Sequence, residues 1–468
     1  MAEIPYQFDP DTRVEALIAK HADLAEGQET EDVVTIAGRL MLRRVQGKLA
    51  FGTLDDSSGR IQLFAPAKST PDFEDFCDLN LGDWVGVTGV VMTTRRGELS
   101  VRVDSWTRLA EARRSFPDKW HGISDTDTRY RQRYVDLWVT PEARRAFQTR
   151  SRMISLTRSF LEERGAMEVE TPMFHPIPGG ANARPFTTHH NALDLDLYLR
   201  IAPELYLKRL TVAGFDKVFE IGRVFRNEGV STRHNPEFTM LELYEAYADY
   251  QDIMRLVEEL VEYLAIELTG STVLNVGDRE LDVAKPWRRA TMTELIEEST
   301  GVAVTLDTPI EELREIASQN EVPIKESYGP GKLILEIYEK TTESSLWGPV
   351  YVTDYPVEVS PLAREHRSNP GMTERFEAIV AGRELCNGFS ELLDPEQQRI
   401  RFEEQAAQNA DGDDEAMLVD EDYLRALEYG LPPTRGVGIG MDRLAMLLTG
   451  ATSIRDVVLF PTLRPEQP

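Results

Sequence analysis

The chain has 468 residues, 41% of them hydrophobic and 28% charged, and a formal net charge of −28. It can therefore build a sizeable core over about two to three domains, and it is not a disordered polyanion. Its two cysteines, Cys77 and Cys386, exclude a disulfide framework or a CxxC zinc site, and no apolar run approaches the roughly 18 residues of a membrane span. Since no signal peptide begins the sequence, we expect a soluble cytoplasmic protein without a membrane partner.

The charge is unevenly distributed along the chain. Residues 1–32 carry 2 basic and 9 acidic side chains, residues 33–150 carry 19 and 15, and residues 151–468 carry 31 and 56. Binding to a phosphate backbone depends on local clusters of Lys and Arg rather than on net charge. The middle segment therefore favours a nucleic-acid contact, although an ordinary solvated surface has a similar composition.

Residues 33–109 follow the acidic N-terminal segment, 1–32, and have the pattern of a small all-β domain. The strand-like runs, separated by turn residues, are 33–42, 49–54, 61–65, 84–93 and 98–106. Such a series is typical of an OB-fold β-barrel, with an SH3-like barrel or a small sandwich as alternatives. Basic and aromatic side chains on its first strands predict contacts with single-stranded nucleic acid, unless the rings belong to the core. The predicted contacts are Arg39, Arg43, Phe51 and Phe64, in a cluster that also contains Arg44 and Lys48.

Residues 110–140 form a polar connector, and residues 141–468 are predicted to form one large α+β domain. Thr140-Pro141-Glu142 predicts the start of a long helix that ends before Gly165. Beyond it, strand-like runs with short gaps favour an antiparallel sheet flanked by helices. These runs are 218–228, 238–246, 350–354, 376–381, 384–392 and 436–440, and an exposed acidic loop is expected at 410–415.

The glycine-rich phosphate-binding motifs of common nucleotide folds are absent from the sequence. Lys332 of Gly329-Pro330-Gly331-Lys332 is followed by Leu333, and the glycines of 436–440 do not match GxGxxG. A protein that binds ATP without a phosphate-binding helix N-terminus needs arginines and metal ions for the same electrostatic role.

The first of three polar stretches is 219–244. Strand spacing places Arg226 and Glu228 on one face, and likewise Glu242 and Tyr244. A buried strand face carries Arg and Glu only where they meet a ligand or pair with each other. A binding site and an internal ion-pair network therefore both remain open for this stretch.

The second polar stretch, 375–391, is predicted to form a hairpin that turns at Ala381-Gly382. Glu377 and Glu384 would then be diagonal neighbours able to share magnesium on a polyphosphate, with an exposed acidic strand edge as the alternative. The residues that alternate onto one pocket-lining face are Asn387, Phe389 and Glu391. Glu384 is out of phase with them, so the register stays open and a β-bulge would reconcile it.

The third polar stretch, 436–444, combines glycines with Arg443 at the start of a predicted helix. Glycines allow a ligand to approach the backbone closely, which favours a nucleotide contact for Arg443 over a solvated position.

Together these stretches resemble the signature motifs of class II aminoacyl-tRNA synthetases, with the first family motif at 165–172. The runs 178–186, 200–209 and 387–392 resemble the bacterial lysyl-tRNA synthetases in particular, and the likeness extends from about residue 33 to residue 464. The resemblance implies a homodimeric ligase with an OB-fold anticodon-binding domain. It also implies that Mg²⁺ and ATP activate L-lysine to lysyl-adenylate, and that the lysyl group passes to the 3′ end of tRNA(Lys).

The family pattern also implies a role for each matching residue. Arg226 and Arg443 are the implied catalytic residues, and Glu377 and Glu384 the implied magnesium ligands. The implied ATP-binding residues are Arg226, Glu228, Arg233, His234, Asn235, Phe238, Glu377, Glu384 and Arg443. The implied lysine-binding residues are Glu204, Arg226, Glu242, Tyr244, Asn387, Phe389 and Glu391, with Glu391 and Tyr244 receiving the side-chain amine.

Some features depart from the family pattern. Cys386 and Leu393 are unusual residues near the implied lysine pocket, Asn182 replaces a usually small residue in the Pro-Gly-Gly loop, and the segment before the barrel is short and acidic. Drift or core packing explains the three substitutions, and an altered inhibitor or substrate profile is the functional alternative.

Other functions fit the sequence less well than a lysine-activating enzyme. A paralogue that lysylates a protein would lack the barrel, and a lipid-directed one would carry membrane spans. The related aspartate and asparagine enzymes would be expected to have Arg or Lys facing the side chain of their amino acid, whereas Glu391 is suited to bind a cationic side chain. A catalytically silent nucleic-acid-binding protein would not be expected to retain Arg226, Glu377, Glu384 and Arg443 together.

Overall fold

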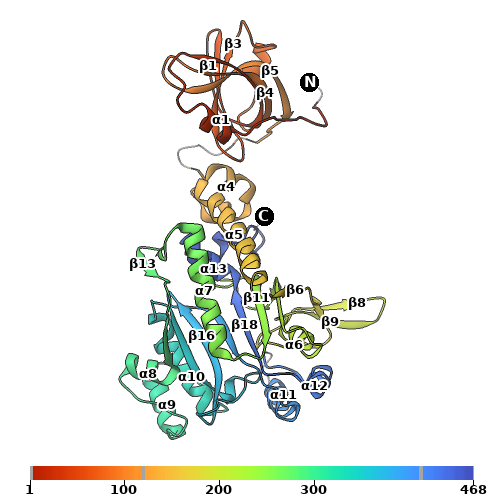
Figure 1. Ribbon diagram of the computed structural model, residues 1–468, viewed down its shortest axis with the longest axis vertical. Helices are drawn as coiled ribbons and strands as arrows, with labels where there is room; N and C mark the ends of the chain where they lie inside the picture. Colours follow the sequence, from red (N-terminus) through yellow and green to blue (C-terminus); the bar gives the residue numbers. More distant parts are fainter. Residues whose placement is uncertain (1–3, 115, 117–121, 411–414, 467–468) are drawn as a thin grey trace. The chain divides into compact units, whose positions relative to one another are not determined.

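A computed structural model describes residues 4–114, 116, 122–410 and 415–466. The chain forms two compact units, Met1–Ser124 and Asp125–Pro468, each described by itself below (Figure 1). Residues 411–414 of the expected acidic loop lie outside the described residues, as do 115 and 117–121 of the expected connector.

The first unit is a closed five-stranded barrel with strand order β1-β2-β3-β5-β4, which confirms the predicted β-barrel. Its elements are α1 (Val14–Lys20), β1 (Glu29–Gln46), β2 (Leu49–Asp55), β3 (Arg60–Pro66), α2 (Phe73–Cys77), β4 (Trp84–Thr93) and β5 (Leu99–Ala110). Alternate residues of the strands point inward, as Val34, Ile36 and Leu40 do on β1. A Cβ at Gly38 would lie 2.4 Å from the Asp55 carbonyl oxygen, so this glycine lets β1 and β2 close tightly.

The second unit is built on an eight-stranded sheet with strand order β14-β15-β16-β17-β18-β11-β10-β6. Its strands are β6 (Met167–Glu168), β10 (Lys217–Phe225), β11 (Glu237–Ala246), β14 (Arg288–Thr291), β15 (Val350–Pro356), β16 (Met372–Val380), β17 (Arg383–Ser390) and β18 (Thr434–Gly440). The strands from β15 to β10 pair antiparallel, as predicted, whereas β14–β15 and β10–β6 at the edges are parallel. The sheet is therefore mixed.

Helices cover one face of this sheet (Figure 1). Hydrophobic residues of α5 (Pro141–Glu162), α7 (Tyr250–Thr269) and α13 (Met441–Thr449) share a core with Phe219, Leu243 and other residues of the strands. The helix α7 starts with a capping box, in which Asp249 and Asp252 bond each other's backbone N–H, and it ends at Gly270 in the left-handed conformation. The opposite face of the central strands carries polar side chains.

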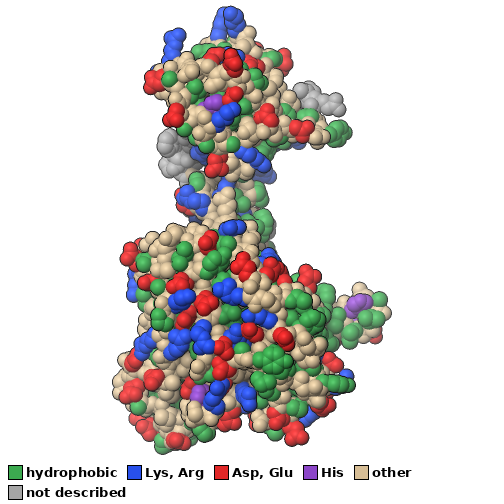
Figure 2. All heavy atoms as spheres, viewed as in Figure 1, with side chains coloured by type: hydrophobic (Ala, Val, Ile, Leu, Met, Phe, Trp, Pro, Cys, Tyr) green, Lys and Arg blue, Asp and Glu red, His purple; other side chains and the backbone are tan. Residues whose placement is uncertain are grey.

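The remaining elements surround the sheet. They are α3 (Thr126–Arg131), α4 (Arg133–Val139), β7 (Phe174–His175), β8 (Thr187–His190), β9 (Leu195–Leu199), α6 (Glu204–Val212), β12 (Val273–Val276), β13 (Arg279–Asp282), α8 (Met292–Thr300), α9 (Ile310–Gln319), α10 (Pro330–Thr341), α11 (Pro395–Ala410) and α12 (Glu421–Glu428). Figure 2 shows acidic and basic side chains interspersed over this unit and hydrophobic ones at the surface beside the β8–β9 hairpin. In the part of the chain that the structure describes, no helix is long and apolar enough to cross a membrane.

Candidate active site

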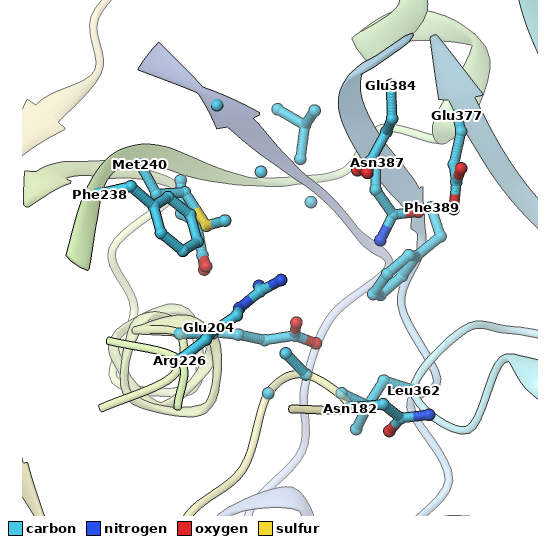
Figure 3. Close-up of a pocket in the computed structure, with 18 of the residues that line it drawn as sticks. Asn182, Glu204, Arg226, Phe238, Met240, Leu362, Glu377, Glu384, Asn387 and Phe389 are labelled. Atoms are coloured by element: carbon cyan, nitrogen blue, oxygen red, sulfur yellow. The ribbon is translucent and has the colours of Figure 1, made fainter. Parts of the chain in front are cut away.

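The polar face of the sheet forms the floor of a cavity of about 410 Å³ (Figure 3). Strand register sets the floor residues in two rows across β16, β17, β18 and β11. One row is Glu377, Asn387, Gly438 and Glu242, and the next is Arg375, Phe389, Gly436 and Tyr244. Because side chains alternate between faces, neighbours such as Leu243, Phe376 and Cys386 point into the helix-covered core instead.

The strand β18 contributes glycines to the floor where the adjacent strands β17 and β11 contribute larger side chains. A Cβ at Gly436 would lie 2.3 Å from Oε1 of Glu391 and 2.5 Å from the ring of Tyr244. Any other residue would therefore fill this part of the site, and Gly436 creates the space in which those two side chains meet.

The β16–β17 hairpin carries the two glutamates predicted to bind magnesium. It turns at Ala381 and Gly382, both with positive φ, as predicted. The register shifts between Ala378 and Ile379, so that Ile379 pairs with Glu384. A bulge is the irregularity that would reconcile the phase of Glu384, and both Glu384 and Asn387 line the cavity.

Each of these glutamates contacts an arginine, but the pKa values of the two carboxyl groups differ. Arg375 donates to Oε1 of Glu377 at 2.6 Å and to Oδ1 of Asn387 at 3.0 Å, while Arg443 donates to Oε2 of Glu384 at 3.0 Å. Burial, and then the negative charge of Glu384, raise the pKa of Glu377 to about 7. Burial also acts to raise the pKa of Glu384, but Arg443 and Arg226 outweigh it and bring that pKa below its usual value.

A pair of carboxylates is a suitable partial ligand set for Mg²⁺, which is bound in phosphate sites by one or two carboxylates and by the phosphates themselves. Among the described residues, no group of three or more His, Cys, Asp or Glu side chains could hold a metal ion alone. Glu377 and Glu384 are therefore suited to bind Mg²⁺ together with the phosphates of a ligand. Among the described residues, the protein side chains alone do not form a metal site.

Arg226 and Glu228 were predicted at strand spacing, but β10 ends at Phe225 and both residues lie in the loop that follows. The loop turns sharply there, because the Glu228 N–H donates to the Arg226 carbonyl at 2.8 Å. The Arg226 guanidinium lies 5.2 Å from the ring centroid of Phe238, and its Nε is buried without a hydrogen-bond partner among the described residues. Burial lowers its pKa, against the opposing effect of Glu228 and Glu384. An unpartnered guanidinium N–H in a cavity is available to an anionic ligand.

The rest of this loop reaches the same cavity. Its lining residues are Glu228, Arg233, His234 and Asn235. The Ser231 hydroxyl accepts the N–H groups of Arg233 and His234, each at 3.0 Å, which fixes the loop tip. Burial, and then the charge of Arg443, lower the pKa of His234, so this ring is neutral at physiological pH.

Buried carboxylates gather at the other end of the cavity. Glu204, Glu242 and Glu391 are 6%, 3% and 1% exposed. The Tyr244 hydroxyl donates to Oε2 of Glu242 at 3.1 Å, and not to Glu391, its expected partner at the substrate amine. Burial raises the pKa of all three carboxyl groups, most strongly those of Glu242 and Glu391.

Sequence reasoning missed one cation in this group, Lys208. Its ammonium donates to Oε1 of Glu204 at 2.5 Å and forms an ion pair with Oε2 of Glu391. Lys208 follows Glu204 by four residues on α6, a spacing that brings side chains together on a helix. That spacing could have revealed the pair, and Arg375, two residues before Glu377, could have been found in the same way.

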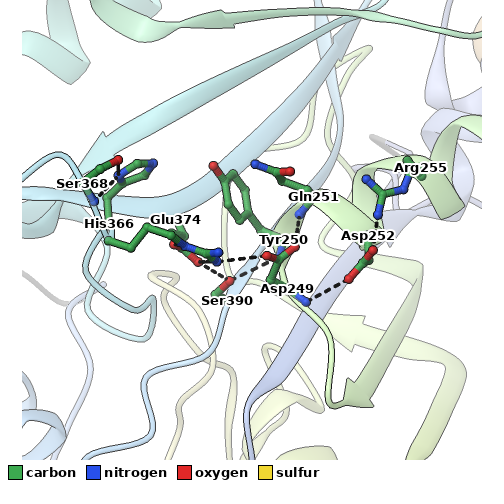
Figure 4. A network of polar contacts seen from close by, with 10 residues as sticks. Asp249, Tyr250, Gln251, Asp252, Arg255, His366, Ser368, Glu374 and Ser390 are labelled. Carbon is green, nitrogen blue, oxygen red and sulfur yellow. Dashed lines mark hydrogen bonds and ion pairs between the residues drawn. The ribbon is translucent and has the colours of Figure 1, made fainter.

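A polar network anchors the strand end that carries Glu391 (Figure 4). The Ser390 hydroxyl donates to Oε2 of Glu374 at 2.7 Å and accepts the Tyr250 N–H at 3.2 Å. Arg367 joins Glu374 and Asp249, each at 2.9 Å. Since Ser390 precedes Glu391, these contacts fix the backbone from which the Glu391 carboxylate projects.

The three unusual residues have different surroundings. Cys386 lies in the helix-covered core, and Leu393 packs in a separate cluster with Leu362, Phe389 and Tyr423. Asn182 lines the cavity near Leu362 (Figure 3).

In the barrel, Phe51 and Phe64 lie opposite each other on β2 and β3, half-buried, with ring centroids 5.5 Å apart. The adjacent cation is Arg44, whose Cζ lies 5.3 Å from the Phe51 ring. Arg39 stacks on Trp84 at 4.7 Å, and Arg43 donates to the Leu79 carbonyl. Arg44 therefore completes the basic and aromatic surface more directly than Arg39 or Arg43.

Comparison with known proteins agrees with this geometry. Residues 125–464 match the family described as tRNA synthetases class II (D, K and N), and residues 34–109 match the OB-fold nucleic acid binding domain. The lysine–tRNA ligase of Parasynechococcus marenigrum is 52% identical over 99% of this chain and 94% of its own length. Those of Moorella thermoacetica and Bacillus subtilis are 53% and 51% identical, over 96% and 98% of this chain and 92% and 93% of their own.

Proposed function

The chain belongs to the class II lysyl-tRNA synthetases, and we propose that it activates L-lysine with ATP and transfers the lysyl group to the 3′ end of tRNA(Lys). The observation that carries the choice of amino acid is the buried group of carboxylates, Glu204, Glu242 and Glu391, beside Arg226. A diamino acid supplies the positive charges that such a group requires, whereas an acidic or amide side chain does not.

In the first step, a carboxylate oxygen of lysine attacks the α-phosphorus of ATP. A new P–O bond forms, the bond to the β-phosphate oxygen breaks, and lysyl-adenylate and pyrophosphate result. No protein nucleophile takes part, so catalysis rests on positioning and on stabilising negative charge. Arg226 is proposed to bridge the lysine carboxylate and the α-phosphate, because it lines the cavity and its buried Nε has no hydrogen-bond partner among the described residues.

The ATP is assigned to the end of the cavity that Arg443 and the loop after β10 line. Phe238 stacks on one face of the adenine, and Arg443 covers the opposite face or the γ-phosphate. The loop residues proposed to contact ATP are Glu228, Arg233, His234 and Asn235. Mg²⁺ would be held by Glu377 and Glu384, and when bound it supplies positive charge to the phosphates.

Lysine is assigned to the carboxylate end. Glu391 and Tyr244 receive the side-chain ammonium, and Phe389 packs on its aliphatic chain. Glu204, Glu242 and Asn387 receive the α-ammonium and form the pocket wall. All but Glu391 line the cavity, and Oε1 of Glu391 lies in the space that a side chain at Gly436 would fill. Pairing of each ammonium with a carboxylate offsets the cost of burying it.

The barrel is proposed to bind the anticodon of tRNA(Lys). Its unpaired bases would stack on Phe51 and Phe64, with Arg39, Arg43 and Arg44 near the phosphates. The chain transfers the lysyl group in the second step, when the terminal ribose hydroxyl attacks the carbonyl carbon of the adenylate and AMP leaves.

We further propose that the enzyme is a homodimer. Hydrophobic side chains on and directly after the motif at 165–172 are exposed, namely Met167, Met173 and Phe174, and so are Leu193 and Leu195 at the β8–β9 turn. Apolar side chains gathered in this way favour a protein interface, and a second copy is the partner that the family resemblance implies. Sedimentation velocity at micromolar concentration is expected to give twice the mass of one chain, and a single-chain mass would refute the dimer.

A cytoplasmic location fits the two free thiols, Cys77 and Cys386, and the tRNA substrate.

Transfer of labelled lysine to tRNA tests the proposed function. The full chain with ATP and Mg²⁺ is expected to esterify lysine to tRNA(Lys) and not to tRNA(Asp) or tRNA(Asn). Charging with aspartate or asparagine, or no charging with lysine, would refute the assignment.

A further inference from the structure

Lys208 is an unusual feature of the carboxylate end of the cavity, because it is a fully buried amine in a pocket proposed to receive an amine. Its exposure is 0%, and it contacts Glu204 and Glu391 through the ion pairs described above. Three aromatic rings enclose the ammonium, with centroids at 5.3 Å for Phe389, 5.9 Å for Tyr423 and 6.0 Å for Tyr244. An enclosed cation of this kind is a permanent part of the site.

The charged and titratable groups around Lys208 come from every element packed against it. They are Glu204 on α6, Glu391 after β17, Glu242 and Tyr244 on β11, Tyr423 on α12 with Arg209 beside it, and Arg375 on β16 near Glu204. Among the described residues at this end of the cavity, the three carboxylates of Glu204, Glu242 and Glu391 lie around one buried ammonium, that of Lys208, which forms ion pairs with Glu204 and Glu391. Lysine brings two further ammonium groups, while its carboxylate is assigned to Arg226.

We propose that Lys208 is a positioning and specificity-determining residue, which neutralises one of the three pocket carboxylates so that the remaining charge matches the two ammonium groups of the substrate. This inference rests on the proposed function and deepens it. Three buried carboxylates without Lys208 would leave one negative charge uncompensated when lysine binds, and uncompensated buried charge is strongly unfavourable.

The geometry also shows how Lys208 orients Glu391. Lys208 forms an ion pair with Oε2, while Oε1 lies beside Gly436 and the Tyr244 ring, and neither oxygen has a hydrogen-bond partner among the described residues. An unpartnered oxygen of a 1% exposed carboxylate requires a donor. Because Lys208 is paired with Oε2, the proposal assigns Oε1 to the substrate amine.

The test replaces Lys208 in the full-length enzyme and follows lysine-dependent ATP–pyrophosphate exchange between pH 6.5 and 8.5. In Lys208→Met, a proton on one carboxyl group substitutes for the missing cation at low pH. As pH rises this proton is lost, and the unmatched charge weakens the complex. We therefore expect the parent-to-variant ratio of kcat/KM for lysine to increase from about tenfold at pH 6.5 to about a hundredfold or more at pH 8.5. Titration of lysine itself cancels in this ratio.

Three further variants separate charge balance from a structural role. Lys208→Met with Glu204→Gln restores the charge, and Lys208→Arg keeps it, so both are expected to give a ratio that does not change with pH. Lys332→Met is the control, because Lys332 and Glu336 also form an i,i+4 ion pair, in the reverse order and at 2.7 Å, on α10 outside the cavity. It is expected to leave the KM for lysine within twofold.

A pH-independent ratio for Lys208→Met, or a ratio for the double variant that still increases with pH, would overturn the inference. If Lys208→Met alone does not fold, Lys208→Arg decides, since a ratio that increases with pH in that variant contradicts charge balance. Failure of the proposed function is distinguishable, because the parent enzyme would then show no lysine-dependent exchange.

Discussion

The guanidinium of Arg443 donates from Nη1 to the backbone carbonyl of Glu384 at 2.8 Å and to its carboxylate at 3.0 Å. This contact joins the first turn of α13 to the bulged strand β17. It therefore holds a proposed phosphate-binding cation beside a proposed magnesium ligand, and it explains why the pKa of Glu384 lies below that of Glu377.

Replacement of Arg443 by alanine should impair ATP use more than lysine use. Loss of a preorganised charge near the phosphates typically costs about 10²–10³ in rate. We expect kcat/KM for ATP in pyrophosphate exchange to fall by that factor, while the KM for lysine changes less than about threefold. Arg279→Ala, which removes an arginine stacked on Trp347, is the control. A KM for lysine that rises as much as kcat/KM for ATP falls would contradict the assignment.

Replacement of Glu391 by glutamine should impair lysine recognition specifically. Removing one partner of a buried ion pair costs roughly 3–5 kcal/mol, so we expect kcat/KM for lysine to fall by about two to three orders of magnitude. The KM for ATP should remain close to that of the parent. Glu245→Gln, a glutamate paired with Lys217 at 3.0 Å outside the cavity, controls for loss of an ion pair. Unchanged lysine activation by Glu391→Gln would refute the role of Glu391.

Changes in the barrel should affect tRNA and not amino-acid activation. Stacking of a base on an aromatic side chain contributes about 1–3 kcal/mol. Phe51→Ala and Arg44→Ala are therefore expected to raise the KM for tRNA(Lys) at least about fivefold while pyrophosphate exchange is unchanged. Arg60→Ala, on the same barrel and largely exposed, should leave both steps unchanged. A loss of exchange activity in Phe51→Ala would instead indicate a folding defect.

His175 should make stability depend on pH. The ring is 3% exposed, and burial lowers its pKa from 6.5 to about 4. The unfolded chain therefore binds a proton below about pH 6.5 that the folded chain does not. The free energy of unfolding should fall by roughly 1.4 kcal/mol per pH unit from pH 6.5 down to the folded pKa.

His175→Gln removes this titration and keeps a donor for the Pro172 carbonyl, which lies 3.0 Å from His175 Nε2. Urea unfolding at pH 7.5 is expected to show the variant about 1 kcal/mol less stable, with a shallower loss of stability below pH 6.5. Parallel curves for the two proteins would exclude His175 as the source of the slope.

Much of the fold was predictable because local sequence signals agree with it. Turn residues marked the barrel strands, and Thr140-Pro141 and Gly165 bracket α5, which spans Pro141–Glu162. The two-residue strand β6 and the edge strand β14 were not predicted, since their pairing depends on tertiary contacts more than on local pattern.

The site was harder to predict where it depends on distant residues. The phase of Glu384 indicated that a bulge would reconcile the hairpin. The position of that bulge, between Ala378 and Ile379, depends on how β16 and β17 pair in the folded sheet. Sequence spacing can connect Glu204 with Lys208. No local pattern indicates that Glu391, far along the chain, also forms an ion pair with Lys208. The end of β10 before Arg226 was also missed, because a strand-like pattern continues past the last ladder pair, Phe225–Glu237.

The central claim is that the acidic pocket beside Arg226 selects a diamino acid for reaction with ATP. Exchange of labelled pyrophosphate into ATP, measured with each of the twenty standard amino acids in turn, tests it most directly. Stimulation by lysine alone is the predicted result. Stimulation by aspartate or asparagine in place of lysine, or by no amino acid, would contradict the account.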